Sequence, residues 1–218
     1  MLQFLLNFGQ SFNGTYLSVF LWNIFGGAST PPTVVMKFIA WNVRVVKKPQ
    51  IREEFRFIIH AHQPDTLFLT EKMVAGKATK RLISQFGFYF YDFVNPVNHS
   101  GGLWVLWNNT IIIANVLLKE QCFIHMLVLD IKTQHLSTIS NVYAPTKGSE
   151  KPSFWHHLIE LNAVIDTPWC FIGNFNELEE GTDKKGGTPI SPLQCVKLLN
   201  FLNTVNATTF PILSGPYT

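Results

Sequence analysis

Five apolar, strand-like segments follow one another between residues 88 and 143, and they constrain the fold more than any other feature of the sequence. They are residues 88–94 (FYFYDFV), 101–107 (GGLWVLW), 110–118 (TIIIANVLL), 121–131 (QCFIHMLVLDI) and 135–143 (HLSTISNVY). Turn-forming stretches that contain Asn, Gly, Lys-Glu or Lys-Thr-Gln separate them. Short apolar runs bounded by such residues are typical of β-strands. We therefore predict a β-meander in the middle of the chain.

The segments before this meander alternate between strand and helix. Residues 37–42 (KFIAWN) and 65–70 (DTLFLT) have the apolar character of buried strands. Apolar residues at helical spacing predict a helix over 50–62, and a second helix is predicted from about 75 to 86. After the meander we predict a helix over 153–165, a short buried strand over 169–172, a loop over 181–192 and a last helix over 192–203.

The composition indicates one domain with a sizeable core. The chain has 218 residues, of which 47% are hydrophobic and only 14% are charged. The formal net charge of +3 allows an anionic partner. Lys and Arg gather only in small clusters, however, so the sequence shows no strong basic patch for nucleic acid. The three cysteines lack the spacing of a zinc site, and a reduced interior is the simplest interpretation.

The first part of the chain differs sharply from the rest, because no charged residue precedes Lys37. A signal peptide would need a basic segment before its apolar core, and a membrane span would need about 20 uninterrupted apolar residues. Neither pattern fits. We interpret residues 1–35 as an apolar N-terminal extension of uncertain origin that packs poorly or not at all against a domain over 36–218. We accordingly favour an intracellular location, in the nucleus or cytoplasm, over secretion or membrane anchoring.

Five short blocks each close an apolar, strand-like run. In chain order they are Trp41-Asn42, 69–72 (LTEK), 100–103 (SGGL), 141–145 (NVYAP) and 173–176 (GNFN). Each block alone is a weak signal, but their order and spacing resemble the endonuclease/exonuclease/phosphatase family over roughly residues 36–218. Within that family the blocks look most like the endonuclease domain of plant LINE-type (non-LTR) retrotransposons.

This resemblance implies an α+β fold, the four-layer αββα sandwich of DNase I-like proteins. In that fold two sheets pack face to face, and the site lies where their strand ends meet. Residues 214–218 (SGPYT) resemble the start of a further family block. The family blocks that supply an Asp and a Ser-Asp-His end do not follow. We therefore expect a sandwich that is incomplete, or truncated, at the C-terminus.

The resemblance also implies a Mg²⁺-dependent phosphodiesterase, with Mn²⁺ as an alternative metal. The implied metal residues are Glu71, as ligand, and Asn42, as organiser of the metal site. Tyr143 and Asn176 would contact the phosphate. Each has an ordinary interpretation when taken alone: a strand-end Glu is commonly a solvated charge, an Asn a turn residue and a strand Tyr a packing residue.

Asn174 departs from the family pattern, which has Asp at this position as the acceptor of the proton from the attacking water. A carboxamide can hold a water but takes up no proton near neutral pH. Loss of a general base commonly lowers the rate by about 10²–10⁴, so we expect DNA nicking by this chain to be absent or strongly impaired.

Two other functions stay open on the sequence. One is a non-catalytic retrotransposon remnant that binds nucleic acid weakly through the small basic clusters near 44–48 and 184–185. The other is a phosphatase acting on phosphoinositides or small phosphoesters. The sequence does not decide among substrates, because loops rather than strands set substrate choice in this fold.

Overall fold

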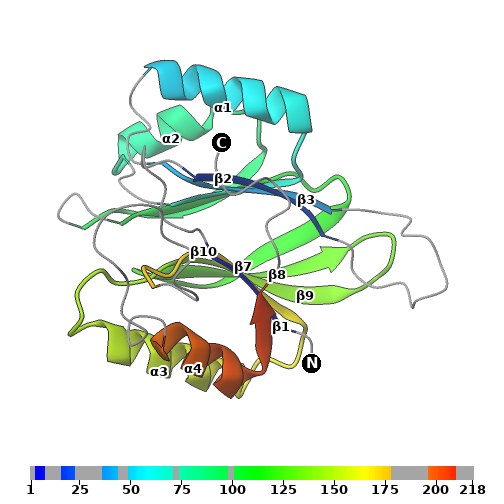
Figure 1. Cartoon of the computed structure of the whole chain (residues 1–218). Coiled ribbons are helices and arrows are strands. Elements are labelled where there is room, and N and C mark those ends of the chain that lie inside the picture. Colours follow the sequence, from blue (N-terminus) through cyan, green and yellow to red (C-terminus); the bar gives the residue numbers. More distant parts are fainter. Residues whose placement is uncertain are drawn as a thin grey trace.

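The structure is a computed structural model that describes residues 3–7, 16–22, 36–43, 49–70, 74–97, 101–177 and 196–209. Two β-sheets lie face to face, with helices on both outer sides (Figure 1). One sheet is covered by α1 (Pro49–His62) and α2 (Lys77–Ile83), and the other by α3 (Lys151–Asn162) and α4 (Val196–Val205). The predicted α+β fold with αββα layers is confirmed.

The first sheet has five strands in the order β2-β3-β4-β6-β5. Their bounds are β2 (Tyr16–Trp22), β3 (Met36–Asn42), β4 (Thr66–Thr70), β6 (Leu103–Trp107) and β5 (Phe90–Val94). β3 and β4 are parallel neighbours linked through α1, whereas the other pairs are antiparallel. Since β3 and β4 run in the same direction, their carboxyl ends lie at one edge of the sheet.

The second sheet has six strands in the order β11-β1-β10-β9-β8-β7. Their bounds are β11 (Ala207–Thr209), β1 (Gln3–Asn7), β10 (Trp169–Asn174), β9 (Leu136–Tyr143), β8 (Phe123–Asp130) and β7 (Ile112–Glu120). β7, β8 and β9 form an antiparallel meander, while β9, β10, β1 and β11 are parallel. The predicted meander is therefore divided, because β5 and β6 belong to the first sheet and only β7 to β9 to the second.

Central strands such as β4, β6 and β10 are buried on both faces, which explains why they read as continuous apolar runs. Consecutive strand residues point to opposite faces. On β3, for example, Phe38 lies in the core between the sheets, and Ile39 lies in the core under α1 and α2. A third apolar cluster, which includes Phe171 and Phe201, fills the space between the second sheet and its helices.

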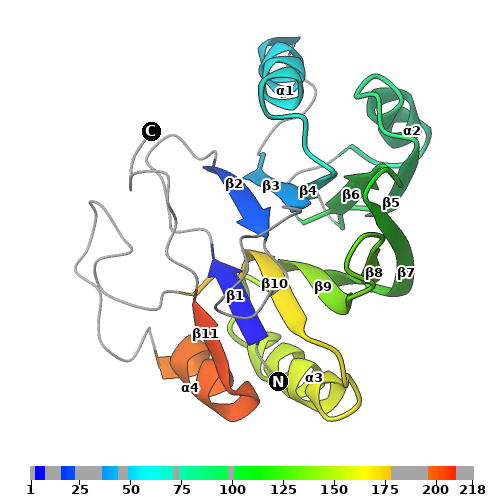
Figure 2. The ribbon, with the colours of Figure 1, turned by 90° about the vertical axis from the view of Figure 1, so that its right-hand side faces the viewer.

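Two segments within residues 1–35 are strands of these sheets. β1 pairs in parallel with β10 and β11, and β2 pairs antiparallel with β3, as Figure 2 shows. The expectation that residues 1–35 pack poorly or not at all is therefore wrong for these two segments. The physical reason is that a sheet edge presents unpaired N–H and C=O groups, and an uncharged apolar segment can satisfy them as a further strand. The division of the chain at residue 36 stays a prediction.

The other predicted elements agree with the structure within a few residues. Helices α1, α2 and α3 and strands β3, β4 and β10 lie where the sequence predicts them. The described part of α4 begins at Val196, and β11 is not predicted from the sequence. The predicted loop over 181–192 lies outside the described residues. None of the described helices has the length and apolar character needed to cross a membrane.

Candidate functional site

On the face of the first sheet that points toward the second sheet, the last residue of a strand is polar in two neighbouring strands. On β3 this inward row contains Phe38 and Ala40, and the period of two continues it to Asn42. On β4 the row contains Phe68 and continues to Thr70. Asn42 and Thr70 are register partners at the carboxyl ends of the two parallel strands. Both are almost completely buried.

The second sheet has a similar arrangement. On β9 the inward row contains Ile139 and Tyr143, with Asn141 between them, and on β10 it runs from Ile172 to Asn174. β10 packs against β3 and β4, and β9 packs against β4 and β6. Polar side chains from both sheets therefore meet where the core between the sheets ends.

Three buried oxygen atoms at this end lack a hydrogen-bond partner in the part of the chain that the structure describes. They are Oδ1 of Asn42, Oγ1 of Thr70 and Oδ1 of Asn141. Buried polar atoms are nearly always hydrogen-bonded, so three unpartnered oxygens need an explanation. Carboxamide and hydroxyl oxygens suit a hard cation or an ordered water.

The side chains in the described residues do not by themselves supply enough ligands for a metal site. No group of three His, Cys, Asp or Glu side chains that could hold a metal occurs among the described residues. Glu71, the predicted ligand, directly follows Thr70 in sequence but lies outside the described residues. The neutral oxygens of Asn42 and Thr70 therefore fit a divalent cation only if a carboxylate such as that of Glu71 adds negative charge.

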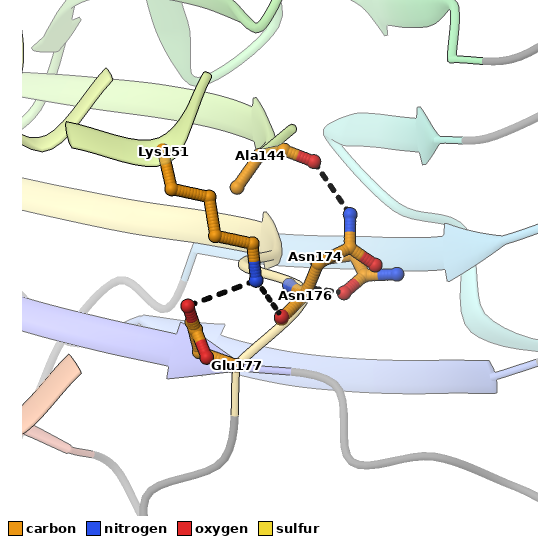
Figure 3. Close-up of polar contacts among 5 residues, drawn as sticks. All are labelled: Ala144, Lys151, Asn174, Asn176 and Glu177. Carbon is orange, nitrogen blue, oxygen red and sulfur yellow. Dashed lines mark hydrogen bonds and ion pairs between the residues drawn. The ribbon is translucent and has the colours of Figure 1, made fainter. Parts of the chain in front are cut away.

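Asn174 and Asn176 build the turn that follows β10. The Asn174 Oδ1 accepts a hydrogen bond of 2.8 Å from the backbone N–H of Asn176. Asn176 has a φ of 49°, a conformation that Asn tolerates better than most residues. Its Nδ2 donates to the carbonyl oxygen of Ala144 (Figure 3). The turn after β10 is thus hydrogen-bonded to Ala144, the residue directly after the end of the neighbouring strand β9.

A nearly buried ion pair holds the same turn from the other side. The Nζ of Lys151 donates to the Asn176 carbonyl oxygen at 2.7 Å and lies 2.8 Å from Oε1 of Glu177 (Figure 3). The two charged side chains are only 11% and 10% exposed. Sequence reasoning missed this pair. The one available signal was the lysine in the first turn of α3, where the helix dipole disfavours a cation.

Tyr143 lines an open pocket of about 890 Å³ between β9, the β7–β8 turn and α3. Glu120, Cys122 and Glu150 also line it. Burial, and to a smaller extent the negative charges of Glu150 and Glu120, raise the pKa of the Cys122 thiol to about 11. The thiol is therefore protonated at neutral pH and is not an activated nucleophile.

A Ser–His pair lies in the second sheet, on the face covered by α3 and α4. His125 Nδ1 is hydrogen-bonded to Ser140 Oγ, which also accepts a bond of 2.6 Å from Trp169 Nε1. Burial, with a smaller contribution from His157, lowers the pKa of His125 to about 3. Ser140 is fully buried and His125 is 2% exposed. A substrate cannot reach this pair, so its role is structural.

Comparison with solved structures identifies the architecture. The AP endonuclease LMAP from Leishmania major superposes with a TM-score of 0.60 at 17% identity, over 87% of this chain and 72% of that one. The chain has the endonuclease/exonuclease/phosphatase fold. No family model and no curated protein sequence matches it.

Two further structures with this fold resemble the chain. One is the endonuclease domain of TRAS1, a telomere-specific non-LTR retrotransposon, with a TM-score of 0.53 at 9% identity over 75% of this chain and 70% of that one. The other is the 3′ phosphatase NExo from Neisseria bound to product DNA, with a TM-score of 0.51 at 16% identity over 78% and 71%. Such low identities establish the fold alone, and the resemblance to plant LINE elements stays a prediction.

The endonuclease/exonuclease/phosphatase fold brings four of the predicted site residues to one end of the sandwich. Asn42 and Tyr143 face the space between the sheets, and Asn174 and Asn176 form the adjoining turn. Glu71 lies outside the described residues. The roles assigned to these five residues stay predictions.

Proposed function

We propose that this chain is a metal-dependent phosphodiesterase domain that acts on DNA, with its cleavage step impaired by Asn174. The observation that carries the proposal is a pair of buried oxygens, on Asn42 and Thr70, that have no hydrogen-bond partner among the described residues. Thr70 directly precedes Glu71, and both oxygens lie at the end of the sandwich where Tyr143 and Asn174 lie. Two of the similar structures are named as endonucleases, and the third was solved with product DNA.

The proposed metal site consists of Glu71 and Asn42. Glu71 would supply the negative charge and Asn42 a neutral oxygen. A bound Mg²⁺, or Mn²⁺ in its place, would neutralise the phosphoryl oxygens and stabilise the leaving oxygen.

The proposed phosphate contacts are Tyr143 and Asn176. Asn176 uses one Nδ2 hydrogen on the Ala144 carbonyl. A carboxamide nitrogen carries two hydrogens, so the second is available to a phosphate oxygen.

Asn174 explains the expected weakness of cleavage. Its Oδ1 accepts the N–H of Asn176, which fixes the carboxamide at the end of β10. A carboxamide fixed in this way can orient a water but cannot take its proton. An aspartate at this position can accept the same N–H, so Asn174→Asp should restore a general base without changing the turn.

The test is a plasmid-nicking assay with Mg²⁺ or Mn²⁺ on the wild type, Asn174→Asp and the double variant Asn174→Asp/Glu71→Gln. We expect little or no nicking by the wild type, a rate about 10²–10⁴ higher for Asn174→Asp, and loss of that gain in the double variant. A folded Asn174→Asp protein that does not nick DNA would overturn the proposal.

DNA binding in the same preparations tests the non-catalytic alternative. Binding that needs no metal and survives Glu71→Gln would support a remnant that only holds nucleic acid. Few phosphate contacts would then give a shallow salt dependence, with a slope of about −0.9 per contact.

A further inference from the structure

A single buried amide, that of Asn141, connects the two sheets beside the candidate site. Asn141 Nδ2 donates to the carbonyl oxygen of Leu69 on β4 at 3.4 Å and to that of Trp104 on β6 at 3.1 Å. Leu69 and Trp104 are register partners in the first sheet. Asn141 itself belongs to β9 of the second sheet and is fully buried. Its side chain therefore links one strand of the second sheet to two strands of the first.

An apolar residue at position 141 would suit the core better than asparagine. The neighbouring inward residue Ile139 is apolar, and the Asn141 Oδ1 has no hydrogen-bond partner in the described part of the chain. A buried amide with one unsatisfied oxygen is unfavourable compared with a well-packed aliphatic side chain. Packing alone thus does not explain an asparagine here.

The two bonds of Asn141 are made at strand ends that carry candidate site residues. Leu69 directly precedes Thr70, and Asn141 lies two residues before Tyr143 on the same face of β9. We propose that Asn141 is a positioning residue that fixes the ends of β4 and β9 relative to each other, and so sets the geometry of the cation site. The consequence for cation binding rests on the proposed function, whereas the link between the sheets does not.

The first test measures backbone amide hydrogen exchange without metal in the wild type and in Asn141→Leu. Two amides report on the linked strand ends: Val43 N–H donates to Thr70 O, and Ala144 N–H donates to Asn174 O. We expect Asn141→Leu to speed exchange at both amides about tenfold or more, at an unchanged or higher melting temperature. Asn141→Ala serves as a second variant that cannot overpack the core.

Thr66→Val is the matched control. Thr66 lies at the other end of the inward row of β4 and is buried, and its hydroxyl also has no hydrogen-bond partner in the described ranges. Its replacement should leave exchange at Val43 and Ala144 unchanged. Unchanged exchange at both amides in the Asn141 variants would overturn the proposal, since the link would then not hold the strand ends.

The second test is calorimetric titration of the same proteins with Mn²⁺. Loss of a residue that orients a metal site commonly weakens metal affinity by about 10–100-fold, and we expect a loss in this range for Asn141→Leu but not for Thr66→Val. Faster exchange with unchanged Mn²⁺ affinity would reduce Asn141 to a structural residue and overturn the positioning role. If the wild type binds no Mn²⁺, the proposed function fails, and the exchange data still decide whether Asn141 links the sheets.

Discussion

The Oδ1 of Asn174 lies 2.8 Å from the backbone nitrogen of Asn176 and accepts its hydrogen bond. The residue at this position therefore also builds the turn that places Asn176. A carboxylate can make the same bond, so asparagine preserves the turn while it removes the negative charge and the proton acceptor. A substitution between Asn and Asp at position 174 can thus change the charge and the proton acceptor without changing the turn.

Gly173→Ala should destabilise the protein strongly. Gly173 has a φ of 144°, and a Cβ added there would lie 2.0 Å from the Val142 carbonyl oxygen. The clash is with backbone of the adjacent strand, so it cannot be relieved by a side-chain rotation. We expect the free energy of unfolding to fall by about 3 kcal/mol or more in urea denaturation. Gly148→Ala, where the added Cβ meets nothing within 4 Å, is the control. Similar losses for both variants would contradict this explanation.

Lys151→Met should also lower stability, because it removes the ammonium group from beside the nearly buried Glu177 carboxylate. Breaking one partner of a buried pair commonly costs about 3 kcal/mol. Lys147→Met provides the comparison, since the Lys147–Glu150 pair is exposed and should be worth less than about 1 kcal/mol. Denaturant unfolding of the two variants measures the difference. Equal effects would show that burial of the Lys151 pair is unimportant.

Tyr143→Phe tests the proposed phosphate contact. In the Asn174→Asp background we expect the loss of one hydroxyl donor to lower nicking by about 10²-fold, with a stability change of only about 1 kcal/mol. Tyr89→Phe is a suitable control because Tyr89, which directly precedes β5, is 84% exposed. Undiminished nicking by the Tyr143 variant would remove this residue from the site.

His125 should make stability fall in acid. Its pKa is about 3 in the folded protein and about 6.5 when unfolded, so between these values only the unfolded chain is protonated at this residue. The contribution of neutral His125 to the free energy of unfolding is fully present above about pH 6.5 and is lost progressively as the pH falls toward 3. Between pH 7.5 and 4.5 the loss should be about 3 kcal/mol.

The measurement for this prediction is urea unfolding of the wild type and His125→Gln at both pH values. Other groups titrate in the same range, but they are shared by both proteins. A smaller loss for the variant supports the assignment, and parallel losses refute it.

The sequence predicted the elements whose signals are local. β3 and α1 were predicted because apolar spacing within a few residues identifies a buried strand or an amphipathic helix. The allocation of strands to sheets is not a local property. The turn between β6 and β7 resembles the other turns of the expected meander, yet there the chain passes from one sheet to the other.

β1 and β2 illustrate the same limit more strongly. Their segments have no charge and no clear helical or strand period, so the sequence gives little evidence for structure. They are ordered by pairing with β10 and β3, and neither partner can be identified from the segments themselves.

Within the candidate site, residues could be predicted from the sequence only where they lie in blocks that resemble the family. Asn42, Tyr143, Asn174 and Asn176 were identified because they stand in family-like blocks. Asn141 lies in one of those blocks and was still overlooked. Its significance comes from two carbonyl groups far away in sequence, which only the packing of the sheets brings within reach.

The pairing of β1 with β10 has a consequence for protein synthesis. The strand over Gln3–Asn7 is synthesised before its partner over Trp169–Asn174, and most of the domain is made between them. Until then the apolar N-terminal segment has no sheet to join. Such sequence-distant pairing slows folding and prolongs the exposure of aggregation-prone segments. Recovery of folded protein should therefore depend on translation speed and chaperone supply more than on its final stability.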